Sequence, residues 1–82
     1  MPKVFEKEGF LFFFYMNEHL PVHVHVMKNG KKAKFAVSES GVLLVADGGL
    51  KPSEIKKAQE LADERRMEII AKWNQVFGKE SL

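Results

Sequence analysis

The sequence predicts an α+β domain, in which a mainly antiparallel sheet of four to five strands carries one long C-terminal helix packed on one face. Apolar residues in the first half, residues 1–50, run continuously or alternate with polar ones, which is typical of strands. In residues 51–78 they recur every three or four positions instead, which is typical of an amphipathic helix. The 82 residues suffice for one domain, residues 1–82, and not for two.

Four segments of the first half have the patterns of strands. Residues 10–16 are aromatic and continuous, as expected of a strand that is buried on both faces. Valine and histidine alternate strictly over residues 22–26, and the Asn29-Gly30 pair that follows is a strong signal for a two-residue hairpin turn. Residues 32–37 are therefore expected to return as the partner strand, and residues 42–45 to add a further one.

The hairpin turn sets which residues face each other. If Asn29 and Gly30 form the turn, the register follows by counting outwards. The facing pairs are then Lys28–Lys31, Val26–Ala33, His25–Lys34, Val24–Phe35 and His23–Ala36. Because side chains alternate between the faces of a sheet, one face carries only the apolar residues Val22, Val24, Val26, Ala33, Phe35 and Val37. We expect the helix to cover this face, while His23 and His25 lie on the opposite one.

The C-terminal segment carries one apolar helical stripe, formed by Ile55, Ala58, Ala62, Ile69, Trp73 and Val76. Pro52 suits the first turn of this helix, and Gly78 suits the position beyond its end. Arg66 lies inside the stripe rather than opposite it. A helix over residues 52–77 would be roughly 39 Å long, whereas strands of seven residues span only roughly 23 Å. We therefore expect the end of the helix, with Trp73 and Phe77, to overhang the sheet.

More apolar residues are present than one thin core should cover. In the aromatic run, alternate residues must point away from the helix, and Leu43 and Val45 fall on the histidine face as well. An apolar patch on so small a domain typically marks a contact surface. We therefore expect a homodimer or a complex with a partner protein. The expected interface residues are Phe13, Tyr15, Trp73 and Phe77.

The three histidines lie close together, between positions 19 and 25. His23 and His25 share one face of a strand, so they can present two imidazoles to one metal ion, with His19 as a third ligand, or to a phosphate group. Lys34 beside His25 favours an anion over a cation. We therefore expect His23 and His25 to act as catalytic acid and base. Lys34 and His19 would bind the anion, and no metal ion or other cofactor is expected.

Arg66 is the third catalytic candidate, because a guanidinium group suits a phosphate or a carboxylate. The alternative for Arg66 is a structural pairing with Asp47, Glu6 or a backbone carbonyl. If the helix covers the valine face, Arg66 starts on the side of the sheet opposite the histidines. It would then reach them only near a sheet edge or from a second subunit. For the histidines too, packing or exposure to solvent without a function is the alternative.

Composition excludes several functions and leaves others open. The chain has no cysteine, so it has neither a disulfide nor a thiolate, and it suits a reducing cytoplasm. Its strongest apolar run, residues 10–16, is too short to cross a bilayer, so no membrane association is expected. A net charge of +2 does not by itself indicate a nucleic-acid binder. The hairpin tip gathers four lysines, which could contact nucleic acid or protect the sheet edge, namely Lys28, Lys31, Lys32 and Lys34.

The segment around the histidines has a known pattern. Residues 12–26, and above all residues 19–25, resemble a small bacterial family classed as domain of unknown function 4160. The likeness covers nearly the whole chain. Many members of that family have a proline at the position of Val22 and an aspartate at the position of Glu18, so this chain departs mildly from the pattern at both places.

The resemblance implies a function. Genes of this family often lie beside a gene for another small protein, which implies the toxin half of a toxin–antitoxin pair with a cognate antitoxin-like partner. The positions that match the pattern are His19, Pro21, His23, His25 and Arg66. We therefore expect a toxin-like protein that acts on RNA through a site of histidine, arginine and lysine. The alternatives are a non-enzymatic protein-interaction module and a small metal-binding domain built on histidines.

Overall fold

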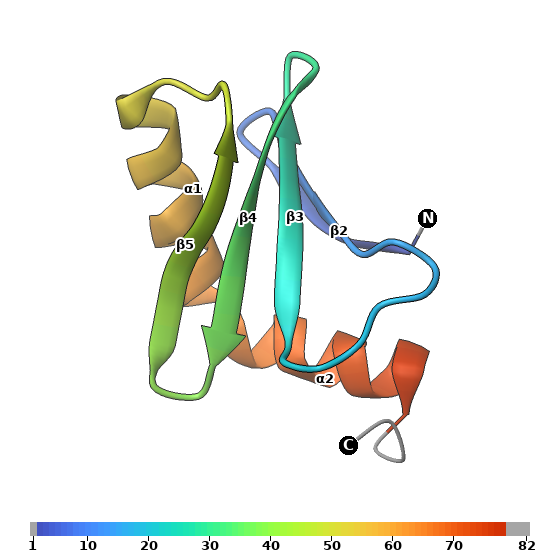
Figure 1. Cartoon of the computed structure of the whole chain (residues 1–82). Coiled ribbons are helices and arrows are strands. Elements are labelled where there is room, and N and C mark those ends of the chain that lie inside the picture. Colours follow the sequence, from blue (N-terminus) through green and yellow to red (C-terminus); the bar gives the residue numbers. More distant parts are fainter. Residues whose placement is uncertain (1, 79–82) are drawn as a thin grey trace.

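The fold is a five-stranded antiparallel sheet that is covered by two helices (Figure 1). The computed structural model describes residues 2–78, so residues 1 and 79–82 of the predicted domain lie outside the described part. The elements are β1 (Lys3–Lys7), β2 (Phe10–Phe13), β3 (His23–Lys28), β4 (Lys31–Ser38), β5 (Gly41–Gly48), α1 (Pro52–Glu64) and α2 (Arg66–Phe77). Each strand pairs with the next one along the chain. The α+β class and the antiparallel sheet are confirmed.

Strands β3 and β4 form the hairpin in the predicted register. Asn29 and Gly30 lie at the turn, and both have positive φ angles, 52° and 78°, which a two-residue turn of type I′ requires. The facing pairs are Lys28–Lys31, Val26–Ala33, His25–Lys34, Val24–Phe35 and His23–Ala36. All of these pairs agree with the prediction, so the valine face and the histidine face of the hairpin are confirmed as well.

The core lies between the valine face of the sheet and the two helices. From the hairpin, Val24, Val26 and Phe35 are fully buried. The helices contribute Ala58, Leu61, Ala62, Ile69 and Trp73, and the aromatic run contributes Phe10, Phe12 and Phe14. Helix α1 contacts β5, whereas α2 contacts β4 and β1. Each helix thus covers a different part of the valine face. Burial of this apolar surface is the main source of the stability of the fold.

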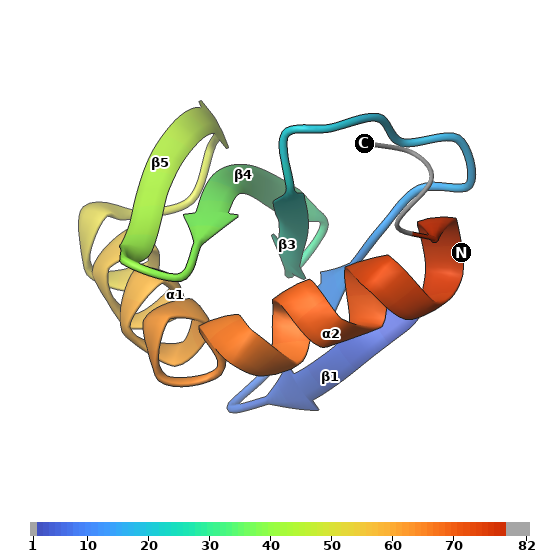
Figure 2. The ribbon, with the colours of Figure 1, turned by 90° about the horizontal axis from the view of Figure 1, so that it is seen from below.

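The prediction of one long C-terminal helix was wrong, because the segment forms two helices that meet at Arg65. The backbone of Arg65 departs from helical angles, with φ −114° and ψ 24°. Arg66, the charged residue inside the apolar stripe, donates hydrogen bonds to the carbonyl oxygens of Glu39 (2.8 Å) and Asp63 (2.9 Å). These bonds hold Arg66 at the junction and satisfy a carbonyl near the end of α1. Helix α2 therefore turns away from α1 and crosses the sheet (Figure 2).

The end of α2 does not overhang the sheet as expected. Trp73 is fully buried, and its ring contacts Phe14 and Phe77 at centroid distances of 5.3 Å and 4.6 Å. The break at Arg65 explains the difference, since helices of 13 and 12 residues are each roughly 18–20 Å long and match the sheet. Among the described residues, no helix has the length and apolar character that crossing a bilayer requires.

The substitution Val24→Ala should lower the free energy of unfolding by about 2–3 kcal/mol, because it removes two methyl groups from a fully buried position. Val45 is 54% exposed in the same sheet and provides the matched control, Val45→Ala, with an expected change within about 0.5 kcal/mol. Urea denaturation followed by circular dichroism measures both variants. Equal effects of the two substitutions would contradict this placement of the core.

Candidate functional site

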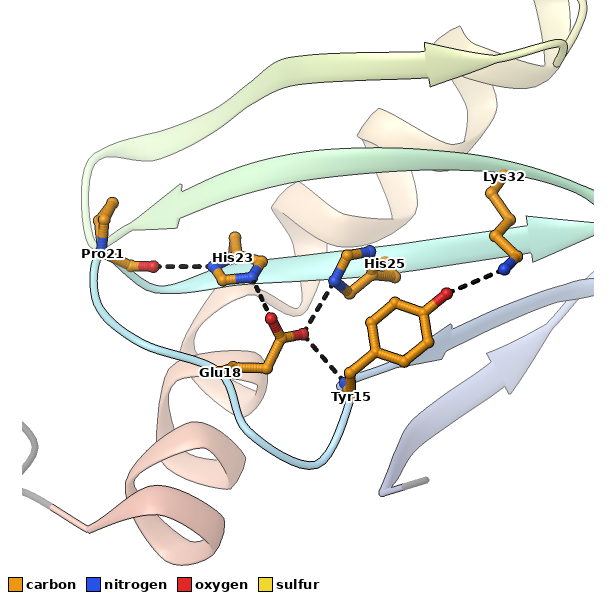
Figure 3. A network of polar contacts seen from close by, with 6 residues as sticks. All are labelled: Tyr15, Glu18, Pro21, His23, His25 and Lys32. Atoms are coloured by element: carbon orange, nitrogen blue, oxygen red, sulfur yellow. Dashed lines mark hydrogen bonds and ion pairs between the residues drawn. The ribbon is translucent and has the colours of Figure 1, made fainter.

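Three side chains meet where strand β3 begins, those of Glu18, His23 and His25 (Figure 3). Oε1 of Glu18 lies 2.7 Å from Nε2 of His23, and Oε2 of Glu18 lies 2.8 Å from Nε2 of His25. The three side chains are only 11% to 14% exposed. Their polar atoms lie within 4.8 Å of one another, close enough to hold one ion. We call these three residues the Glu18 cluster.

The cluster forms because a loop folds back onto a strand. The alternation in β3 places His23 and His25 on one face, with ring centroids 5.3 Å apart. The loop between β2 and β3 brings the Glu18 carboxylate to both rings, and the backbone amide of Tyr15 donates a hydrogen bond to its Oε2 (2.9 Å). Helix α2 contributes Trp73, whose ring packs against His23 at 5.2 Å. The loop, β3 and α2 therefore position the cluster together.

The hydrogen bonds of His23 show that a proton must lie between this residue and Glu18. Its Nδ1 is 2.9 Å from the carbonyl oxygen of Pro21, and a carbonyl only accepts, so Nδ1 carries a hydrogen. In a neutral imidazole, Nε2 would then direct its lone pair at the lone pairs of the Glu18 carboxylate. A proton must therefore be shared between Nε2 of His23 and Oε1 of Glu18, which lie 2.7 Å apart. A metal ion would take the place of this proton if the two atoms moved apart.

His25 has one engaged ring nitrogen and one free one. Its Nε2 donates to Glu18, whereas Nδ1 has no partner among residues 2–78 and is not buried. The ring lies against Phe13 and Tyr15, with centroid distances of 5.5 Å and 4.5 Å. These aromatic contacts fix the orientation of the ring. Nδ1 of His25 is thus an accessible polar atom of the cluster.

The surroundings lower the pKa values of two members of the cluster. Burial would raise the pKa of Glu18, but the hydrogen bond from the Tyr15 amide and the interactions with His23 and His25 outweigh it, so this pKa lies below its usual value. Burial lowers the pKa of His25, and the charges of His23 and Lys34 act in the same direction, against the attraction of Glu18. Glu18 is therefore ionised and His25 neutral near pH 7.

A hollow of about 300 Å³ opens beside His25. Its lining includes Tyr15, Lys32, Lys34 and Asp47. The Lys32 ammonium donates a hydrogen bond to the Tyr15 hydroxyl (2.9 Å; Figure 3), and Lys34 faces His25 across the hairpin. Two lysines against one aspartate leave the lining with a net positive charge. We call this feature the lysine hollow.

The structure brings some predicted site residues together and keeps others apart. His23, His25 and Lys34 lie on one face of the hairpin, as expected. His19 is exposed and makes no hydrogen bond or ion pair with the cluster among residues 2–78. Arg66 lies at the junction of the two helices, where it is hydrogen-bonded to carbonyl groups. Among residues 2–78, neither Arg66 nor His19 is hydrogen-bonded to His23 or His25.

The predicted interface residues divide into buried and exposed ones. Phe13 and Trp73 are 1% and 0% exposed, so they pack inside the chain. Phe77 is half-buried against Trp73. Tyr15 and Leu43 are 41% and 72% exposed and belong to the apolar surface expected on the histidine face. Of the four predicted residues, Tyr15 therefore offers the largest exposed fraction to a partner.

Glu18 is the candidate residue that sequence reasoning missed. It stands in a loop, where no periodic pattern assigns a side chain to a face. The signal that could have found it was an acidic residue in a short segment with three histidines, since carboxylates and imidazoles together are typical of metal sites and proton-transfer sites. Tyr15 and Lys32 were likewise assigned no role at the site, because their meeting depends on the path of the same loop.

A five-stranded sheet with a carboxylate–histidine cluster where its third strand begins defines a small α+β protein whose candidate ligand sites are this cluster and the neighbouring lysine hollow. The model of one family, described as Domain of unknown function (DUF4160), matches residues 9–74. This match spans well over half of the chain, so the chain belongs to the family, as the resemblance predicted. The matched segment includes the Glu18 cluster and the lysine hollow. No curated protein and no solved structure matches the chain.

The substitution Glu18→Gln should lower the free energy of unfolding by about 1–3 kcal/mol at pH 7, because both histidines lose a charged hydrogen-bond partner. Glu60 is exposed on α1, so the matched control Glu60→Gln should change stability by no more than about 0.5 kcal/mol. Urea denaturation in the presence of EDTA measures both variants without a contribution from metal ions. If Glu18→Gln changes stability no more than the control, the cluster does not form in solution.

Proposed function

We propose that the chain is a toxin-like protein that binds RNA in the lysine hollow and acts on its phosphate backbone at the Glu18 cluster. The observation that carries this proposal is the hollow beside His25, where Lys32, Lys34 and the Tyr15 hydroxyl gather. Lysines that neutralise phosphates supply most of the affinity in sequence-independent nucleic-acid binding. The family resemblance supports the toxin role, and the absence of cysteine suits the cytoplasm, where RNA is present.

The charges around the hollow support an anionic ligand. Lys32 and Lys34 project from the hairpin face that carries His25, whereas Lys28 and Lys31 at the tip project from the other face. The exposed ring of Tyr15 offers a face on which a base can stack. Glu18 opposes a phosphate only weakly, because both of its carboxylate oxygens are engaged by histidines. A single-stranded RNA therefore meets both a phosphate site and a stacking surface.

The Glu18 cluster supplies the chemical groups next to the hollow, because His25 belongs to both. Glu18 and His23 share a proton, as their hydrogen bonds require, and this pair is neutral overall. The positive charge that stabilises a reacting phosphodiester is therefore that of Lys32 and Lys34 in the hollow. Arg66 is not included in the proposal, since its guanidinium is engaged at the helix junction.

A second function, binding of a partner protein, is favoured by the free edge of the sheet. Strand β5 is an edge strand, and Leu43, Leu44 and Val45 on it are 72%, 42% and 54% exposed. Exposed apolar edge strands pair readily with other chains. We propose that a second copy of the chain or a cognate antitoxin-like protein covers this edge. The lining of the lysine hollow includes Asp47 near the end of β5 but not Leu43, Leu44 or Val45, so a partner on these three residues is compatible with RNA binding.

Expression of the chain in bacteria should stop growth and degrade cellular RNA, whereas the double variant His23→Ala/His25→Ala should do neither. The variant His19→Ala is the control and should act as wild type, because His19 is exposed and outside the cluster. Growth curves and electrophoresis of total RNA provide the readouts, and immunoblots verify equal amounts of soluble protein. Normal growth on wild-type expression, or arrest by the double variant, would refute the toxin proposal.

The substitutions Lys32→Ala and Lys34→Ala should each weaken binding of a short single-stranded RNA at low salt. The slope of log Kd against log salt should fall by roughly 0.7 for each phosphate contact that is lost. Lys56 is exposed on α1, away from the hollow, so Lys56→Ala is the matched control and should leave the slope unchanged. Fluorescence anisotropy with labelled RNA measures all three variants. An equal loss of RNA affinity in Lys56→Ala would show that RNA is attracted by the overall charge of the chain. The lysine hollow would then not be the RNA-binding site.

A further inference from the structure

The Glu18 cluster has the composition of a transition-metal site. It combines two imidazole nitrogens with one carboxylate, and these polar atoms lie within 4.8 Å of one another. Its side chains are 11% to 14% exposed, so the place between them is largely shielded from solvent. Two histidines and one carboxylate are a ligand set of catalytic zinc sites, which keep a fourth position for water or substrate.

The hydrogen bond from His23 to Pro21 is an independent observation that points to a metal ion. In metal sites, the ring nitrogen that does not bind the ion usually donates to a carbonyl or a carboxylate, which fixes the tautomer and the orientation of the ring. Nδ1 of His23 does this at 2.9 Å and thereby directs the Nε2 lone pair at Glu18. A proton or an ion is required at that place, and the ligand atoms of His23, Glu18 and His25 lie within 4.8 Å of one another.

We propose that Glu18, His23 and His25 bind one divalent transition-metal ion, with Zn²⁺ as the best match, through both Nε2 atoms and the carboxylate. Metal–ligand distances of about 2.0–2.2 Å place the ligand atoms of a tetrahedral site roughly 3.4 Å apart. The carboxylate oxygens lie 2.7 Å and 2.8 Å from the two nitrogens, so Glu18 would withdraw by about 0.6–0.7 Å. Glu18 stands in a loop, and its withdrawal would lengthen the hydrogen bond that its Oε2 accepts from the Tyr15 amide.

The chemistry of the donors decides which ions fit. Imidazole nitrogens suit Zn²⁺ and its neighbours, whereas Mg²⁺ prefers an octahedron of oxygen ligands. Lys34, which led to the expectation of an anion here, makes no hydrogen bond or ion pair with the cluster among residues 2–78. With His23 and His25 neutral as ligands, the carboxylate of Glu18 leaves the cluster with one negative charge. That charge favours a divalent cation.

A bound ion would add a Lewis acid next to the lysine hollow. Such an ion polarises a phosphate oxygen and generates a nucleophile by lowering the pKa of a bound water. The hollow shares His25 with the cluster, so the ion would lie beside the RNA that we propose there. Metal binding itself does not rest on the proposed function, because it needs only the three side chains and the Pro21 carbonyl.

Isothermal titration calorimetry of the tag-free, metal-free chain with ZnCl₂ tests the proposal. We expect one Zn²⁺ per chain, and a dissociation constant at least tenfold higher for Glu18→Gln and for His25→Gln. Glutamine retains hydrogen bonding at both positions but is a poor zinc ligand. His19→Gln is the matched control for a neighbouring histidine outside the cluster and should bind Zn²⁺ as wild type does. MgCl₂ should produce no saturable binding.

Circular dichroism verifies that each variant is folded. If a variant fails to fold, two measurements on the wild-type chain test the proposal instead. The first is a rise of Tm when Zn²⁺ is added. The second is the nitrogen chemical shifts of His23 and His25, which should identify Nε2 as the ligand atom in both. Unsaturable Zn²⁺ binding, unchanged affinity in Glu18→Gln, or equal loss in His19→Gln would overturn the proposal. Anisotropy with labelled RNA is a separate readout, so a failure of RNA binding and a failure of metal binding are distinguishable.

Discussion

Strand β3 joins the core to the candidate site, because its side chains alternate between the two faces of the sheet. Val24 and Val26 are fully buried under the helices, and their burial specifies the register of the strand. The same register sends His23 and His25 to the other face. A slip by one residue would bury the histidines and expose the valines. The hydrophobic core therefore determines which face of the sheet carries the two histidines of the site.

This alternation is also the reason why the sheet was predictable from the sequence. The Asn29-Gly30 turn and the strict period of β3 depend only on neighbouring residues, so the facing pairs and the two faces followed from counting. The break between α1 and α2 was not predicted, because it depends on a contact between Arg66 and the carbonyl of Glu39, 27 residues away. The anomalous place of Arg66 inside the apolar stripe was the local sign of that contact.

The candidate site was predictable only in part, for the same physical reason. His23 and His25 follow from local periodicity, whereas Glu18 reaches them through a loop whose path depends on tertiary contacts such as the Tyr15 amide. Without Glu18, the charge of Lys34 dominated the expectation, and an anion was assigned to the place between the histidines. The carboxylate of Glu18 lies at that place instead. An anion is then better accommodated in the neighbouring hollow.

Charge couples the two proposed sites. Without an ion, the carboxylate and the proton that it shares with His23 leave the cluster neutral. A divalent ion would displace that proton and give the cluster a charge of +1. Because the hollow shares His25 with the cluster, this change acts at short range in a partly shielded place, where Coulomb interactions are stronger than in water. An ion in the cluster would therefore raise the affinity of the hollow for phosphate. Linkage requires that phosphate raise the affinity for the ion by the same factor. Glu18 and Lys34 can thus serve one function although their charges are opposite, since one holds the cation and the other the anion beside it.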